Sequence, residues 1–157
     1  MEHKSTKKHT PKEAFPKICR FCAYQERTQQ QVRDKLYELG LNGDDVENII
    51  STLITENFIN EERFAKSYAS GKFRNNHWGR IKIKQGLKAE KISEYCIKKG
   101  LLEISNEDYS QTLRKLISKK SKEFSDKNPL IKKHKVANYL IGKGYEQDLV
   151  WDFLNQQ

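Results

Sequence analysis

The sequence contains few of the residues that interrupt or cross-link a chain. Its 157 residues include only three prolines and eight glycines, which favours helices over many short strands. Three cysteines (Cys19, Cys22 and Cys96) cannot all pair with one another, which suits a reducing cytoplasm. The longest apolar runs fall well short of the roughly 18 residues that a membrane span requires. No apolar stretch follows the basic residues 1–10 either, so we expect neither a membrane span nor a secretory signal.

Hydrophobic residues are also limited. They make up 36% of the chain and charged residues make up 32%, so the chain can fold but cannot build a thick core. This balance favours a thin helical protein with much surface over a compact sandwich or a doubly wound sheet.

Positive charge is abundant and unevenly placed. The net charge is +9, and residues 61–104 contain eleven basic side chains against five acidic ones. Residues 27–60 have the opposite balance, with three basic and six acidic side chains. We therefore predict a polyanionic partner, either nucleic acid or a protein bound to it, contacted mainly by the middle and last thirds. The alternative is that the lysines only keep the protein soluble.

Residues that start and stop helices divide the chain into segments. Helix starts are marked by capping residues at Thr10, Thr28, Asn60, Ser105 and Asn128, and the first two open capping boxes. Glycines fall where helices are expected to stop or turn, at positions 40, 79, 100 and 144. We predict nine helices and no strand, over residues 11–25, 29–39, 44–56, 61–75, 79–89, 93–99, 106–124, 130–142 and 146–155.

One pattern of seven positions recurs 104 residues later with identical spacing. The first set is Val32, Leu36, Gly40, Leu41, Val46, Ile49 and Ile50, and the second is Val136, Leu140, Gly144, Tyr145, Val150, Phe153 and Leu154. Between them, the same spacing fits Ile83, Leu87, Ile92, Ile97 and Leu101, with Lys91 in the glycine slot. Each set predicts two helices joined by a tight turn, with Leu87, Ile97 and their equivalents buried.

A further amphipathic helix precedes each of these pairs, so the sequence predicts an all-α fold of three tandem three-helix modules. We expect a disordered basic tail over residues 1–9, followed by modules over 10–58, 59–104 and 105–157. Modules of this size are marginal alone, so neighbours should stabilise one another in an elongated array, straight or curved. The alternative is one irregular bundle with coincidental spacing.

The middle module contains the strongest candidate for a binding surface. Residues 72–91 contain seven basic side chains and one acid, Glu90, with aromatic residues interleaved. Arginine and lysine beside aromatic rings are typical of nucleic-acid contact. The partner- or DNA-binding residues that we predict are Arg63, Lys72, Arg74, His77, Trp78, Arg80, Lys82, Lys84 and Lys88. In the alternative interpretation, Trp78 belongs to the core and the lysines are merely solvated. We assign no site to the lysine-rich run over residues 114–135.

The sequence shows no pattern that indicates catalysis, a metal or a cofactor. Cys19 and Cys22 form a lone C-x-x-C on an apolar stripe, which favours core thiols over a zinc site with four ligands. The histidines have no metal-ligand spacing, and no phosphate-binding glycine loop is present. We therefore predict a protein that is not an enzyme and needs no cofactor.

Three segments together resemble the RecX family. Residues 58–68 read Phe-Ile-Asn-Glu-Glu-Arg-Phe-Ala-Lys-Ser-Tyr, which is similar to that family's signature segment. Residues 78–81 resemble its glycine-started second helix, and residues 26–28 resemble its opening segment. The likeness extends over about residues 10–157. Two positions depart from the family pattern: Gly86 lies inside a predicted helix, and Lys91 replaces a turn glycine.

The resemblance implies a specific function. RecX proteins lack catalysis and bind the RecA recombinase, whose filament on single-stranded DNA they block or destabilise. The resemblance therefore implies a cytoplasmic, monomeric regulator of recombination and DNA repair with the RecA filament as its partner. The main alternative is an autonomous DNA-binding protein of helix-turn-helix type. Against it, the second and third helices of module one are acidic, and no helix has the Arg/Asn/Gln cluster that base readout requires.

Overall fold

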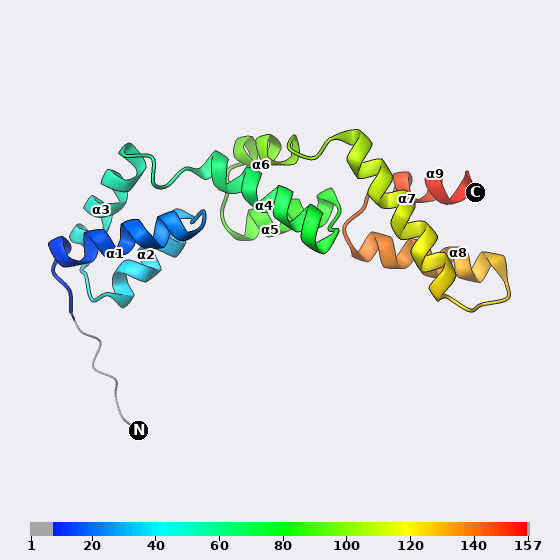
Figure 1. Ribbon diagram of the computed structural model, residues 1–157, viewed down its shortest axis with the longest axis horizontal. Coiled ribbons are helices and arrows are strands. Elements are labelled where there is room, and N and C mark those ends of the chain that lie inside the picture. The colour runs from blue at the N-terminus through cyan, green and yellow to red at the C-terminus, as the bar shows by residue number, and fades with distance from the viewer. Residues whose placement is uncertain (1–7, 157) are drawn as a thin grey trace, which may run out of the picture. The chain divides into compact units, whose positions relative to one another are not determined.

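The structure is a computed structural model that describes residues 8–156, and all regular secondary structure in that range is helical (Figure 1). The helices are α1 (Pro11–Tyr24), α2 (Gln29–Glu38), α3 (Gly43–Thr55), α4 (Glu61–Asn76), α5 (Arg80–Ala89), α6 (Glu94–Leu101), α7 (Asn106–Glu123), α8 (Pro129–Gly142) and α9 (Gln147–Asn155). The prediction of an all-α fold is confirmed, and every predicted helix boundary lies within two residues of an observed one.

The helices group into three successive three-helix modules: module one (α1–α3), module two (α4–α6) and module three (α7–α9). The chain also divides into two compact units. One unit ends at Phe64 and contains module one and the first turn of α4, and the other begins at Ala65 and contains the rest of module two and all of module three.

Side-chain caps start the helices where the sequence predicts them. The Glu13 amide donates to the Thr10 hydroxyl at 3.2 Å, and the Gln31 amide donates to the Thr28 hydroxyl at 3.0 Å. The Gln31 side chain accepts in return from the Thr28 amide, which completes a capping box. The same kind of cap is made by Asn60, Ser105 and Asn128. Each cap stabilises its helix by about 1 kcal/mol, which explains why the boundaries follow the local sequence.

The recurring apolar positions form the cores of the modules. Fifteen of the nineteen residues at these positions, including Leu87 and Ile97, are buried hydrophobic side chains; two, Phe153 and Leu101, are partly exposed, and the other two are the turn glycines. Leu36, Leu87 and Leu140 occupy the same slot in the three modules, and each is fully buried. The spacing found in the sequence is therefore a structural repeat.

The turns between the last two helices of each module share a left-handed residue. Gly40 has a φ of 89° and Gly144 has a φ of 99°, and Lys91 occupies the equivalent position with a φ of 59°. A side chain in this region of backbone space costs about 1–2 kcal/mol relative to glycine. Lys91, which replaces a turn glycine of the family pattern, therefore introduces backbone strain at this turn.

Two other glycines serve close packing on α4. A Cβ at Gly86 would lie 2.1 Å from the Tyr68 hydroxyl oxygen, so the missing side chain makes room for that ring. Gly100 was expected where a helix stops, and it is the residue before Leu101, the last residue of α6. A Cβ there would lie 2.7 Å from the Ala65 carbonyl oxygen, so close approach of two helices explains this glycine.

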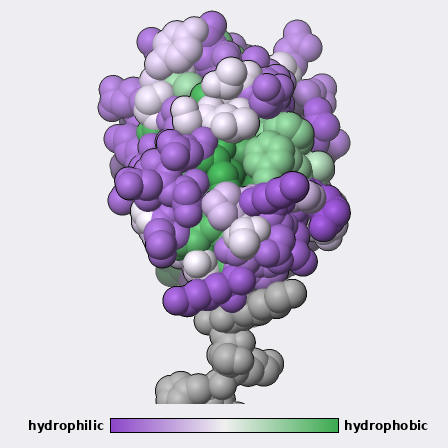
Figure 2. Space-filling view, turned by 90° about the vertical axis from the view of Figure 1, so that its left-hand side faces the viewer, coloured by the Kyte–Doolittle hydropathy of each residue, from purple (hydrophilic) through white to green (hydrophobic). Residues whose placement is uncertain are grey.

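Module one has a core that reaches its surface. Figure 2 shows one face of the molecule, with hydrophobic residues gathered in a patch among hydrophilic ones. In this module the partly buried side chains that pack against the core are Phe15, Cys19, Phe21, Leu39 and Phe58. Three short helices cannot enclose all of the apolar side chains between them.

The predicted N-terminal tail falls largely outside the described residues, which exclude residues 1–7. His9, near the end of that tail, is described: its amide donates to the Leu39 carbonyl at 2.9 Å. Lys8 lies against Gly40, because a Cβ on that glycine would meet the Lys8 Cα at 2.9 Å. These two residues therefore pack on the α2–α3 turn.

Candidate functional site

The turn between α4 and α5 contains two of the predicted binding residues, His77 and Trp78. The His77 amide donates to the Phe73 carbonyl at 3.0 Å, and the Trp78 amide donates to the Lys72 carbonyl at 3.2 Å. His77 adopts a φ of 55°, which reverses the chain direction after α4. The His77 side chain is exposed, whereas Trp78 is half-buried.

Trp78 brings together two of the predicted lysines. The Lys72 ammonium of α4 lies 4.8 Å from the indole ring centre, and the Lys82 ammonium of α5 lies 4.5 Å from it. Each such cation–π contact contributes about 0.5–1 kcal/mol at an exposed site. The indole ring is half-buried, so it belongs partly to the core and partly to the surface, and two positive charges lie beside it. We call these three residues the Trp78 cluster.

Three other predicted residues are exposed cations: Arg74 in the last turn of α4, and Lys84 and Lys88 on α5. None of them forms an ion pair with a residue that the structure describes. Lys84 and Lys88 lie one turn apart on the same helical face, where like charges repel. We call these three residues the unpaired cations. Together with the Trp78 cluster they form what we term the basic surface of module two.

Arg80 has a different role, because it joins module two to module three. Its guanidinium donates to the Glu146 carboxylate at 3.1 Å and to the Asn106 side chain at 2.7 Å, and it stacks 3.8 Å from the Tyr109 ring centre. The Tyr109 hydroxyl donates to Glu146 and accepts from the Arg80 amide at 3.1 Å. Burial, followed by this bond to the carboxylate, raises the pKa of Tyr109 far above its usual value.

The backbones of the two modules also touch directly. The Gly79 amide donates to the Lys143 carbonyl at 2.8 Å, and the Ile81 amide donates to the Gly144 carbonyl at 2.9 Å. A Cβ at Gly79 would lie 2.3 Å from the Gly144 carbonyl carbon, so no larger residue fits. A Cβ at Gly144 would lie 2.3 Å from the Lys82 Cβ. We call this set of contacts, with the Arg80 network, the glycine joint.

Module three also fixes the turn that carries Trp78. The Tyr145 hydroxyl donates to the His77 carbonyl at 2.9 Å, and the Lys143 ammonium donates to the Asn76 carbonyl at 2.8 Å. Tyr145 is fully buried, and burial raises its pKa well above the usual value. The position of the Trp78 cluster thus depends on residues more than 60 positions away in the sequence.

Sequence reasoning did not find the residues of module three that hold this site. The partners that it missed are Asn106, Tyr109, Lys143, Tyr145 and Glu146. One signal was present in the sequence. Gly79 is the N-cap residue of α5 and provides no side-chain cap, whereas Thr, Ser or Asn caps many of the other helices. A glycine at such a start indicates that something else approaches the backbone.

Arg63 is separate from the other predicted residues. Its guanidinium pairs with Glu26 at 2.5 Å and donates to the carbonyls of Asn57 and Phe58 at 3.0 and 3.3 Å. These contacts hold the connection between α3 and α4 against the start of module one's helix pair. The structure therefore shows Arg63 in an internal contact, and no contact of the described residues links it to the basic surface.

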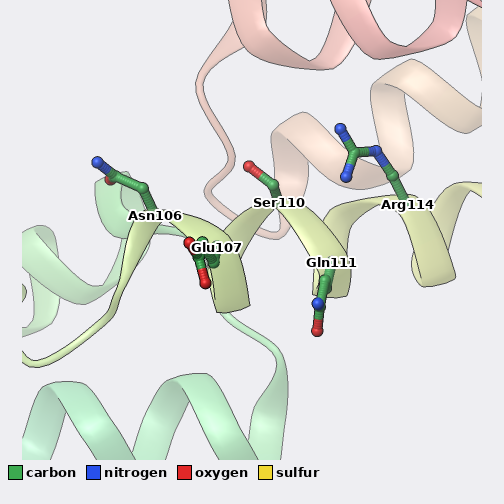
Figure 3. Close-up of a pocket in the computed structure, with 5 residues that line it drawn as sticks. All are labelled: Asn106, Glu107, Ser110, Gln111 and Arg114. Carbon is green, nitrogen blue, oxygen red and sulfur yellow. The ribbon is translucent and has the colours of Figure 1, made fainter.

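The hollow on α7 offers no catalytic arrangement. It has a volume of ≈ 360 Å³ and is lined by Asn106, Glu107, Ser110, Gln111 and Arg114, all from one helix (Figure 3). Ser110 and Arg114 point to the same side of the helix in this view, and Gln111 points to the other. Among these lining residues Ser110 has no histidine beside it and no hydrogen bond to the one carboxylate, Glu107, so the activated pair that a serine nucleophile requires is not formed there.

The cysteines lie in or near the cores as free thiols. Cys22 and Cys96 are buried, and Cys19 is partly buried. Burial, with the neighbouring Cys19 as a smaller cause, raises the pKa of Cys22 to about 11, which leaves the thiol protonated and unreactive at neutral pH. Among the described residues, no group of three His, Cys, Asp or Glu side chains could hold a metal ion. In that same part of the chain, no helix is long and apolar enough to cross a membrane.

Comparison with known proteins gives the same module order. The chain matches family models described as the first, second and third three-helix domains of RecX over residues 14–53, 60–101 and 107–154, respectively. These ranges contain the basic surface and both sides of the glycine joint.

Individual relatives of this chain also have RecX in their names. "Regulatory protein RecX" of Clostridium perfringens is 35% identical over 126 residues, which are 78% of this chain and 58% of the relative. "Regulatory protein RecX" of Streptococcus uberis is 33% identical over 131 residues, 83% of this chain and 50% of the relative. The chain thus spans between half and three fifths of the length of these relatives.

A solved structure agrees in fold. The crystal structure of RecX from Lactobacillus salivarius superposes with a TM-score of 0.84 at 23% identity, covering 93% of this chain and 95% of that one. The three domain models match in chain order and together account for most of the residues, with each model falling on one observed module. This chain therefore belongs to the RecX family of regulatory proteins.

Proposed function

We propose that this chain binds the filament that the RecA recombinase forms on single-stranded DNA and inhibits its activity in recombination and DNA repair. The relatives are named as regulatory proteins, and the RecA filament is the partner that the family resemblance implies. The observation that supports the proposal best is the basic surface of module two, because its unpaired cations have no ionic partner among the described residues.

Charge attracts the basic surface to the filament. A nucleoprotein filament is a polyanion, and each lysine or arginine that approaches a phosphate releases a condensed counterion. The basic surface supplies five such side chains, at Lys72, Arg74, Lys82, Lys84 and Lys88. If all five contact single-stranded DNA, the logarithm of affinity should fall with the logarithm of salt with a slope of about −3 to −4.

The Trp78 cluster adds a second kind of contact. A half-buried indole flanked by two ammonium groups can stack on an unpaired base while the lysines neutralise the adjacent phosphates. Such stacking tolerates any base, which suits a regulator that must act on filaments of any sequence. Inhibition by occupation of the filament requires no catalytic group and no cofactor, and we propose that a cytoplasmic monomer carries it out.

The test is inhibition of ATP hydrolysis by RecA on single-stranded DNA. The variant Arg74→Glu/Lys88→Glu reverses two unpaired cations and leaves Arg80 and the glycine joint intact. It should need at least about tenfold more protein for half-maximal inhibition, because the reversed charges repel the filament. Two exposed lysines of module three provide a matched control, Lys115→Glu/Lys122→Glu, which makes the same change in net charge.

Two outcomes would contradict the proposal. Equal loss of inhibition in both double variants would show that only net charge matters and that the basic surface has no special role. Absence of inhibition by the unaltered chain would remove the proposed function altogether. A tight, sequence-specific complex with duplex DNA that survives moderate salt would instead favour an autonomous DNA-binding protein.

A further inference from the structure

A groove lies between the two last helices of module two. It has a volume of ≈ 340 Å³ and is lined by Lys84 of α5 and by Glu94, Tyr95, Ile97, Lys98 and Leu101 of α6. Ile97 is almost fully buried and forms part of the module core, so the floor of the groove is apolar and supported from below. This volume is at the lower end of ligand pockets, and it suits one or two side chains better than a whole cofactor.

Two large apolar side chains face solvent on α6 and its C-cap: Tyr95, which lines the groove, and Leu102, which follows the lining residue Leu101. Tyr95 is 65% exposed and Leu102, at the C-cap of α6, is 72% exposed. Tyr95, Lys98 and Leu102 are spaced three and four residues apart, so they follow one stripe of the helix. The Lys99 ammonium lies 5.5 Å from the Tyr95 ring centre. Exposed apolar residues that gather beside a hollow indicate a binding surface, whereas single scattered ones do not.

The chemistry of the groove differs from that of the basic surface. Phosphates gain nothing from a leucine or from an apolar floor, but a protein side chain does, and aromatic anchors are typical of protein interfaces. The charges around the groove are mostly positive. Lys84 and Lys98 line it, the Lys99 ammonium lies beside the Tyr95 ring, and Glu94 is the only acid among the lining residues. An apolar floor with a basic rim complements an apolar side chain flanked by acids.

We propose that the α5–α6 groove binds an acidic segment of the recombinase protein and receives an apolar side chain from it. This inference rests on the proposed function and deepens it. Module two then contacts protein through the groove, which includes Lys84, and nucleic acid through the remaining residues of the basic surface. The groove is too small to be a whole interface, so it acts as an anchor within a larger contact.

The experiment compares two affinities of one variant. Tyr95→Ser/Leu102→Ser removes the exposed apolar groups and leaves every lysine in place. Fluorescence anisotropy measures binding to the recombinase filament and, separately, to naked single-stranded DNA. We expect at least tenfold weaker binding to the filament and an unchanged affinity for naked DNA within twofold. The matched control, Leu130→Ser/Ile131→Ser, removes two exposed apolar side chains from α8 and should change neither affinity.

A second variant, Lys98→Glu, guards against loss of fold. Lys98 is exposed, so the substitution should leave the helical circular dichroism intact while it weakens filament binding by several fold. Filament binding that is unchanged in both groove variants would overturn the inference while leaving the proposed function standing. Equal loss of naked-DNA affinity would overturn it by showing that the groove binds nucleic acid.

Two further outcomes separate the remaining possibilities. If the unaltered chain is a dimer in sedimentation and Tyr95→Ser/Leu102→Ser is a monomer, the groove is filled by a second copy and the inference is wrong. If the unaltered chain does not bind the filament at all, the proposed function fails, and this inference fails with it.

Discussion

Module one and the pair formed by modules two and three reach stability in different ways. Module one closes a core with its own three helices, and Arg63 ties its last connection to Glu26. Modules two and three share an aromatic contact between Phe73 and Tyr109, whose ring centres are 5.9 Å apart, and within module three the Tyr109 ring also lies 5.1 Å from that of Tyr145. The three modules repeat the same arrangement of helices, but module one forms a unit by itself, whereas modules two and three together form a larger unit.

The difference shows what a module of about 50 residues needs. A chain of that length buries little of its surface, so its stability is marginal unless a neighbour contributes. In the second unit the neighbour contributes both aromatic packing and the glycine joint, and these contacts also fix the turn that carries Trp78. In that unit the contacts between modules therefore serve stability and the candidate site together.

The largest effect is expected from removing the core leucine that occupies the equivalent position in each of the three modules. Leu36→Ala, Leu87→Ala and Leu140→Ala each remove a fully buried side chain and should cost about 2–5 kcal/mol. Because modules two and three share contacts, Leu87→Ala and Leu140→Ala should each loosen both modules, whereas Leu36→Ala should loosen module one alone. Amide hydrogen exchange resolves the modules, and protection lost only locally in Leu87→Ala would break the comparison.

The glycine joint gives the next largest effect. Gly79→Ala forces a Cβ against the Gly144 backbone and should lower the free energy of unfolding by about 2–3 kcal/mol. Gly71→Ala is the matched control, since nothing lies within 4 Å of a Cβ at that position inside α4. It should instead stabilise the protein by up to about 1 kcal/mol through helix propensity. Urea denaturation measures both, and a neutral Gly79→Ala would show that the joint can open.

Replacing Arg80 and Arg63, which each form an internal ion pair, tests the same comparison between the two units. Arg80→Ala leaves the Tyr109–Glu146 pair without its cation and should cost the second unit about 2 kcal/mol. Arg63→Ala should cost module one about 1 kcal/mol, because the Arg63 side chain is more exposed than that of Arg80, at 39% against 25%, and solvent weakens its ion pair. The midpoint of thermal unfolding of each variant, with exchange to assign the affected unit, measures the difference. A larger effect at Arg63 would reverse the assignment.

The smallest effect concerns the left-handed turns. Lys91→Gly relieves a side chain at a φ of 59° and should stabilise module two by about 1 kcal/mol. In module one the reverse change, Gly40→Ala, introduces the same strain and should cost about 1–2 kcal/mol. Opposite signs in chemical denaturation are the expected result, and a destabilised Lys91→Gly would mean that the lysine side chain has a structural contact.

The helices could be predicted from the sequence because their determinants are local. Thr10, Thr28 and Ser105 cap helices through atoms three residues away, and the apolar spacing follows the helical period itself. The turn at Lys91 could be placed because the apolar positions have the same spacing within each module. Gly100 lies at the expected helix end, but its contact with α4 could not be predicted, because one sequence cannot distinguish a packing glycine from a helix stop.

The candidate site was predicted only in part. Composition identified the basic and aromatic residues of positions 72–91, since a cluster of charge is visible without coordinates. It treated Arg80 as equivalent to Arg74, although one pairs with Glu146 and the other faces solvent. Whether a charge is free depends on what folds against it, and Glu146 lies 66 residues further along the chain.

The sequence by itself thus determined the helices, their grouping into three modules and the location of positive charge, because capping, periodicity and composition act over a few residues. Only the tertiary structure decided which cations remain free, why Gly79 and Gly86 have no side chain, and how Tyr145 holds the turn before Trp78. These features arise from contacts between atoms distant in sequence. Such contacts depend on distances of a few ångströms that no local pattern records.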